Sequence, residues 1–131
     1  MIVVDASALI DALIDDGPGG DGARAVLTDD PEWAAPPHLL VEVLSVIRRR
    51  VLRGEVKLDR AMEVVDALDE LEILWVDPVT VVARIWELRD NVAAFDAAYV
   101  AAAELLECAL ITGDRRLAAA TGPRCPIRPI A

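Results

Sequence analysis

Residues 2–5 read Ile2-Val3-Val4-Asp5, a short apolar run that ends at an acidic residue. Such a run is typical of a strand in a parallel sheet whose two faces are covered by helices. In open sheets of this kind, the active crevice forms beyond the carboxyl ends of the strands. The start of the chain therefore predicts an α/β fold and a place for a functional carboxylate.

A second apolar run with the same ending lies near the other end of the chain. Residues 108–112 (Cys-Ala-Leu-Ile-Thr) are expected to form a strand, and Asp114 follows it after one glycine. Helices and strands are expected to alternate between the two runs, which predicts a parallel sheet with helices on both faces. The expected helices cover residues 8–15, 21–27, 36–53, 59–71, 78–89 and 94–107, and the other strands cover 33–35, 73–76 and a segment near Ile127.

Small polar residues and glycines mark the expected ends of the helices. Ser7 is predicted to cap the first helix, and Asp59 to cap the fourth. Gly17-Pro18-Gly19-Gly20 is predicted to break the chain as a flexible loop. Gly17, Gly19 and Gly22 also fit the Gly-x-Gly-x-x-Gly pattern of dinucleotide-binding proteins, but here the pattern follows a helix instead of a strand, which argues against that function.

Length and composition predict one domain over residues 1–131. The chain is 55% hydrophobic and 27% charged, which is typical of a globular protein, and that length suits a single core. It has only two cysteines, Cys108 and Cys125, too few for a disulfide scaffold and wrongly spaced for a zinc site. We expect a cytoplasmic protein with no membrane span and no export signal.

The charge balance restricts how the chain could bind nucleic acid. Its net charge is −10, and Lys57 is the only lysine. Affinity for nucleic acid through a broad basic surface depends on displacing phosphate counterions, which an acidic chain cannot do. Any contact with nucleic acid must therefore be local. Arginine suits phosphate recognition, but a surface role is the simpler interpretation of Arg89, Arg115 and Arg116.

Four acids stand apart from the rest by their apolar surroundings. Asp5 and Asp114 each follow an apolar strand. Glu42 is the only formal charge between residues 32 and 48, and Asp96 the only one between residues 90 and 104. Burying a lone carboxylate is costly unless a positive charge compensates it. The other acids fall mostly on charged stripes, which predicts a solvated surface for them.

Convergence of these four carboxylates in one crevice would raise their pKa values by mutual repulsion. Divalent cations relieve such repulsion, and oxygen ligands select hard ions such as Mg²⁺ or Mn²⁺. Phosphodiester hydrolysis is the chemistry such a site supports, with one ion activating water and a second stabilising the leaving oxygen. The sequence leaves the number of ions open.

Four segments together resemble the PIN domain of VapC toxins, in order and at that family's spacing: residues 3–9, 40–43, 95–101 and 110–117. The resemblance implies a three-layer α/β/α sandwich with a short, mostly parallel central sheet of four to five strands. It also implies a Mg²⁺- or Mn²⁺-dependent endoribonuclease, the toxin of a type II toxin-antitoxin pair. Its acidic quartet would be Asp5, Glu42, Asp96 and Asp114.

The same resemblance assigns roles to two hydroxyls. Ser7 and Thr112 would hold Asp5 and a metal-bound water in place. The alternatives are that Ser7 caps a helix and that Thr112 is an ordinary strand residue. Phe95 stands where tyrosine is more usual in this family.

Partners also follow from the resemblance: an RNA substrate, a cognate VapB-like antitoxin, and a homodimer or toxin-antitoxin hetero-oligomer. The alternative function is a catalytically silent PIN-like module that binds a partner protein, against which the intact quartet argues. Two other kinds of chemistry are excluded because the residues that they need are missing. Position 7 is serine where a dehalogenase-type phosphotransferase needs a second aspartate, and the only histidine, His38, is expected merely to begin a helix.

Overall fold

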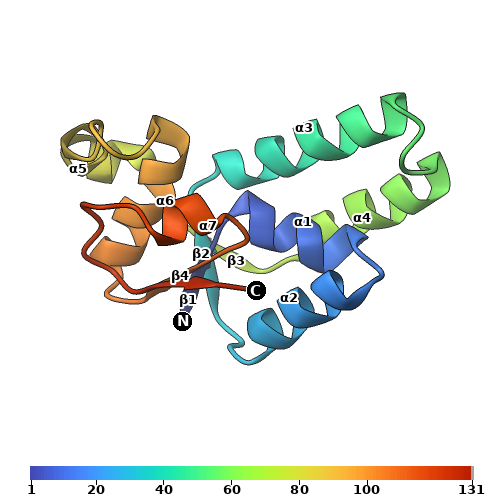
Figure 1. Ribbon diagram of the computed structural model, residues 1–131, viewed down its shortest axis with the longest axis horizontal. Coiled ribbons are helices and arrows are strands. Elements are labelled where there is room, and N and C mark those ends of the chain that lie inside the picture. Colours follow the sequence, from blue (N-terminus) through green and yellow to red (C-terminus); the bar gives the residue numbers. More distant parts are fainter. Residues whose placement is uncertain (131) are drawn as a thin grey trace.

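The computed structural model describes residues 1–130 and has helices on both sides of a central sheet (Figure 1). The sheet has five strands in the order β3-β2-β1-β4-β5, and every pairing is parallel. The strands are β1 (Ile2–Val4), β2 (Trp33–Ala35), β3 (Ile73–Trp75), β4 (Ala109–Thr112) and β5 (Ile127–Pro129). The predicted parallel α/β architecture is confirmed.

The helices form two layers around this sheet. In Figure 1, α1 to α4 lie to one side of the strands, and α5 and α6 lie to the other. The helical segments are α1 (Ala6–Ile14), α2 (Pro18–Thr28), α3 (His38–Leu52), α4 (Leu58–Glu70), the 3-10 turn η1 (Pro78–Val81), α5 (Val82–Glu87), α6 (Ala94–Leu105) and α7 (Arg115–Ala118). None of these helices, within residues 1–130, has both the length and the apolar character needed to cross a bilayer.

The strand order places a crevice at the centre of the sheet. β1 and β4 are neighbours, and Val4 is paired with Ile111. The chain leaves β1 toward β2 on one side and leaves β4 toward β5 on the other. Loops that diverge in this way leave an opening at the carboxyl ends of the two strands. Asp5 and Asp114 follow these two strands, so the fold brings both acids to this opening.

Three local predictions about helix starts are wrong. The N-cap of α1 is Asp5 instead of Ser7, because the Asp5 side chain accepts the hydrogen bond from Ala8. Lys57, not Asp59, precedes α4. The glycine-rich segment is not a flexible loop, since α2 already begins at Pro18. Proline suits the first position of a helix because its missing N–H has no partner to lose there.

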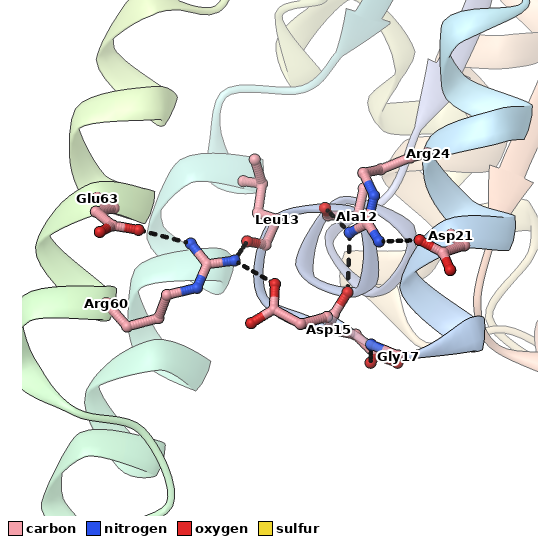
Figure 2. Close-up of polar contacts among 9 residues, drawn as sticks. Ala12, Leu13, Asp15, Gly17, Asp21, Arg24, Arg60 and Glu63 are labelled. Atoms are coloured by element: carbon pink, nitrogen blue, oxygen red, sulfur yellow. Dashed lines mark hydrogen bonds and ion pairs between the residues drawn. The ribbon is translucent and has the colours of Figure 1, made fainter.

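The carboxyl end of α1 is held by two arginines from other helices (Figure 2). Arg24 of α2 donates to the backbone oxygens of Ala12 and Asp15, at 2.9 and 2.8 Å. Arg60 of α4 donates to the backbone oxygen of Leu13 at 2.7 Å. The last carbonyls of a helix lack partners within it, and positive charge is favourable there. These contacts fix α1, whose opposite end carries Asp5.

Candidate active site

Asp5 lies between β1 and α1 and is only 3% exposed. Its Oδ1 accepts hydrogen bonds from the Ala8 backbone N–H at 2.9 Å and from the Ser7 hydroxyl at 2.7 Å. Its Oδ2 accepts one from the Thr112 hydroxyl at the end of β4. Burial raises the pKa of Asp5, whereas these three donors lower it and the charge of Glu42 raises it again. The carboxylate is thus buried, yet held in one orientation.

Ser7 and Thr112 also connect the loop after β1 to the loop after β4. Ser7 Oγ accepts a hydrogen bond from the Gly113 N–H at 2.8 Å. Thr112 Oγ1 accepts one from the Asp114 N–H at 3.0 Å. A Cβ on Gly113 would lie 3.2 Å from Ser7 Oγ, which shows how closely the two loops approach. Both hydroxyls therefore support Asp5, and their role toward a metal stays a prediction.

Asp114 caps the short helix α7 through a hydrogen bond from the Arg116 N–H to its Oδ1, at 2.8 Å. The Arg116 guanidinium lies 3.8 Å from the same oxygen, but its side chain is 96% exposed. Such an exposed pair contributes little to stability. A cavity of about 300 Å³ separates α7 from the start of α6, and both Asp96 and Asp114 line it.

Glu42 and Asp96 complete the group from the second turn of α3 and the first turn of α6. Oε1 of Glu42 is buried and has no hydrogen-bond partner among residues 1–130. Burial raises the pKa of Asp96, and the charges of Asp5, Glu42 and Asp114 raise it further. Within the described residues, no lysine or arginine forms an ion pair with Asp5, Glu42 or Asp96. Asp5, Glu42 and Asp96 therefore repel one another with no lysine or arginine paired to any of them, and His38, 3.1 Å from Glu42, is the side chain that offsets part of this repulsion.

Two further side chains enter the site from the same helices. His38 begins α3, as predicted, and its Nε2 is hydrogen-bonded to the Phe95 backbone oxygen at 3.2 Å. The same nitrogen lies 3.1 Å from Glu42 Oε1. Tyr99 is fully buried against the His38 ring, with ring centroids 4.8 Å apart. Burial raises the pKa of Tyr99 most, the charges of Glu42 and Asp5 raise it further, and so does the approach of its hydroxyl to Glu42.

Sequence reasoning did not assign His38 and Tyr99 to the site, although a signal for both was present. His38 precedes Glu42 by four positions, and Tyr99 follows Asp96 by three. Residues at these spacings share one face of a helix. Each acid therefore has a neighbour of its own helix in the same crevice.

The residues suit a hard divalent cation in their chemistry. The predicted ligands offer only oxygen atoms, one of which is buried without a partner, and their mutual repulsion favours a cation. As the side chains lie, however, no three Asp, Glu, His or Cys residues in the described part of the chain are grouped closely enough to hold one ion. Asp5 is held by three hydrogen-bond donors, so the other carboxylates would have to approach it for all four to share an ion.

A larger cavity lies elsewhere, and none of the four acids lines it. Its volume is about 750 Å³, and it opens at the amino ends of β4 and β5, beside Cys108 and Pro126. Among the charged side chains that line it, Arg84 is already paired with Glu104 at 2.8 Å and with Glu87 at 3.3 Å. The chemistry is therefore concentrated at the opposite edge of the sheet.

Comparison with known proteins identifies the family. The PIN-domain profile matches residues 2–123. Ribonuclease VapC1 of Mycobacterium tuberculosis is 41% identical over 128 residues, which cover 96% of this chain and 95% of that protein. Ribonuclease VapC9 of the same species is 39% identical, covering 97% and 96%.

Solved structures show the same fold at lower identity. VapC20 of M. tuberculosis, a toxin that cleaves the sarcin-ricin loop, has a TM-score of 0.71 at 15% identity, covering 91% of this chain and 94% of that chain. VapBC2 of Rickettsia felis, bound to a DNA fragment from their promoter, has a TM-score of 0.68 at 16% identity and covers 98% of both chains. The chain belongs to the PIN-domain family and, within it, to the VapC ribonucleases.

Proposed function

We propose that this ribonuclease uses Mg²⁺ or Mn²⁺, held by Asp5, Glu42, Asp96 and Asp114, to hydrolyse phosphodiester bonds of RNA. The observation that carries the proposal is that these acids act electrostatically on one another, with no arginine or lysine paired to Asp5, Glu42 or Asp96 among residues 1–130. A divalent cation there would supply the positive charge and Lewis acidity that phosphodiester hydrolysis needs.

Some residues of the chain would orient the metal ligands, and others would supply negative charge. Ser7 and Thr112 hold the Asp5 carboxylate by donating to its two oxygens. Burial keeps water away from Asp5, which strengthens its attraction for a cation. Glu42, Asp96 and Asp114 are less restrained and can adjust to the ion and to the RNA phosphate.

The chain would act as the toxin of a type II pair, with a VapB-like antitoxin as its partner and a homodimer or hetero-oligomer as its assembly. Support comes from the Rickettsia VapBC2 structure of the same fold. The unbalanced acids also favour a basic inhibitory peptide. Cys108 and Cys125 are both free thiols, which suits the cytoplasm. The silent-module alternative is not favoured, because relatives at about 40% identity are named ribonucleases.

Cleavage of structured RNA by the partner-free protein tests the proposal. We expect cleavage with Mg²⁺ or Mn²⁺, none with chelator, and a loss of at least about a hundredfold in Asp5→Asn and Asp96→Asn, since an amide keeps the shape but not the charge. Asp66→Asn changes an exposed acid of α4 and is the control. Equal cleavage by the site variants and the wild type would refute the site assignment.

A further inference from the structure

Tyr99 carries a hydroxyl that the fold does not use. The residue is 0% exposed, and the hydroxyl has no hydrogen-bond partner among residues 1–130. Buried polar groups in folded proteins are nearly always paired, because an unpaired one loses its bonds to water without replacement. The fold alone therefore does not explain why a hydroxyl is present at this buried position.

The second unpaired buried atom belongs to the same site. Of the described side chains, only Tyr99 Oη and Glu42 Oε1 are buried without a hydrogen bond. Tyr99 belongs to α6 and Glu42 to α3. His38, the first residue of α3, has its ring against Tyr99 and its Nε2 3.1 Å from Glu42 Oε1.

The chemistry of these groups indicates which would bond to which. A phenol donates one hydrogen bond, and a carboxylate only accepts. Both oxygens of Asp5 already accept hydrogen bonds, whereas the buried Oε1 of Glu42 accepts none of good geometry and has His38 Nε2 beside it at 3.1 Å. Nε2 of His38 has two oxygen acceptors as neighbours, the Phe95 carbonyl and Glu42, so Nε2 must carry a proton. The Tyr99 hydroxyl and the His38 Nε2–H are thus two donors near one acceptor, the Glu42 carboxylate.

We propose that Tyr99 is a positioning residue: when a divalent cation binds, its hydroxyl donates to the Glu42 carboxylate and, with the His38 Nε2–H, holds Glu42 as a ligand. This inference rests on the proposed function. Groups that hydrogen-bond a metal ligand fix its orientation, and their removal typically weakens metal affinity about 10- to 100-fold. Since the hydroxyl approaches Glu42 but forms no hydrogen bond of good geometry within residues 1–130, its removal should cost the fold little.

The test is Tyr99→Phe, which removes only the hydroxyl and keeps the buried ring. Mn²⁺ affinity is measured by calorimetry without RNA, and melting temperature is measured in chelator. We expect affinity to fall about tenfold or more, with an unchanged or higher metal-free melting temperature. RNA cleavage should recover toward the wild-type rate at high Mn²⁺ concentration.

Companion variants separate positioning from general damage. His38→Leu removes the second donor and should also weaken Mn²⁺ binding, whereas His38→Gln can donate from a similar position and should restore most of the affinity. Thr28→Val removes a hydroxyl of α2 that bonds only to that helix, and it should leave Mn²⁺ affinity unchanged.

Two results would overturn the inference alone: wild-type Mn²⁺ affinity in Tyr99→Phe, or weakened affinity accompanied by a lower metal-free melting temperature. If the wild type itself binds no Mn²⁺ and cleaves no RNA, both the proposed function and this inference fail.

Discussion

Asp96 is the acid on which the repulsion among the carboxylates is clearest. Burial and the charges of three neighbouring carboxylates all raise its pKa above the ordinary 3.8. A raised carboxyl pKa means that the folded state holds its proton more tightly than the unfolded chain does. The free energy of unfolding of the metal-free protein therefore falls as pH rises through this raised pKa. The penalty is complete above the raised pKa and absent below the ordinary one.

Asp96→Asn should accordingly melt a few degrees higher than the wild type at pH 7 in chelator. The difference should shrink as pH is lowered through the raised pKa, because the wild-type carboxyl then takes up its proton. Thermal unfolding followed by circular dichroism across this pH range measures both. A variant that melts lower than the wild type at pH 7 would show that Asp96 stabilises the fold, contrary to this account.

Thr112 is expected to stabilise the fold, whereas the charge of Asp96 destabilises it. It is fully buried, and its hydroxyl is the only side-chain donor to Asp5 Oδ2 among the described residues. Thr112→Val keeps the shape but leaves a buried carboxylate oxygen unpaired, which should lower the free energy of unfolding by about 1–3 kcal/mol. Urea denaturation measures the loss, and Thr112→Ser, which restores a donor, should recover part of it.

Sequence reasoning selected the four acids by two different physical signals. Asp5 and Asp114 stand at strand ends, and Glu42 and Asp96 are isolated charges in apolar helices. His38 and Tyr99 gave neither signal, because a histidine or tyrosine in an apolar helix is usual in a core. Their helical spacing from Glu42 and Asp96 puts them near those acids. Their contacts across α3 and α6 indicate a role, and the sequence does not specify how two distant helices meet.

Among the elements, the contact between α1 and α2 depends on one glycine. A Cβ on Gly20 would lie 1.7 Å from the Asp15 backbone oxygen, so the two helices could not keep their present separation. Gly20→Ala should therefore cost about 1–3 kcal/mol or more of unfolding free energy.

Gly22 of the same helix is the matched control for Gly20→Ala. A Cβ there would only make an ordinary contact at 3.6 Å with the Ile130 backbone oxygen. Gly22→Ala should stabilise the protein by up to about 1 kcal/mol, since alanine favours the helix. Chemical denaturation of both variants gives the comparison, and a Gly20→Ala protein as stable as the wild type would contradict the close approach.

The start of α2 also shows why element prediction failed in that segment. Strands were predicted well because short apolar runs bounded by polar residues are a local signal. Glycines at 17, 19 and 20 gave an equally local signal for a loop. What overrides it is tertiary: α2 packs on α1, and Arg24 joins them through the α1 carbonyls. Such contacts are not visible in a single stretch of sequence.

For the whole molecule, a net charge of −10 means that any salt should stabilise the fold by screening self-repulsion. A specific Mg²⁺ site has to be separated from that general effect. Parallel strands and their crossovers fix where Asp5 and Asp114 meet, and this much follows from the sequence pattern. The sequence pattern does not show how far Glu42 and Asp96 would move when a metal ion binds. The change in stability on adding Mg²⁺ is therefore the property to measure.

Mg²⁺ should raise the melting temperature more than NaCl of the same ionic strength. Binding to the folded state alone stabilises it by RT ln(1 + [L]/Kd), or about 2.7 kcal/mol at a hundred times Kd. Screening acts equally on the wild type and Asp96→Asn, whereas site binding is lost in the variant. The excess stabilisation by Mg²⁺ over NaCl should therefore vanish in Asp96→Asn and persist in Asp66→Asn. An excess that is the same in all three proteins would mean that Mg²⁺ acts on the general negative charge, because only coordination at the crevice depends on Asp96.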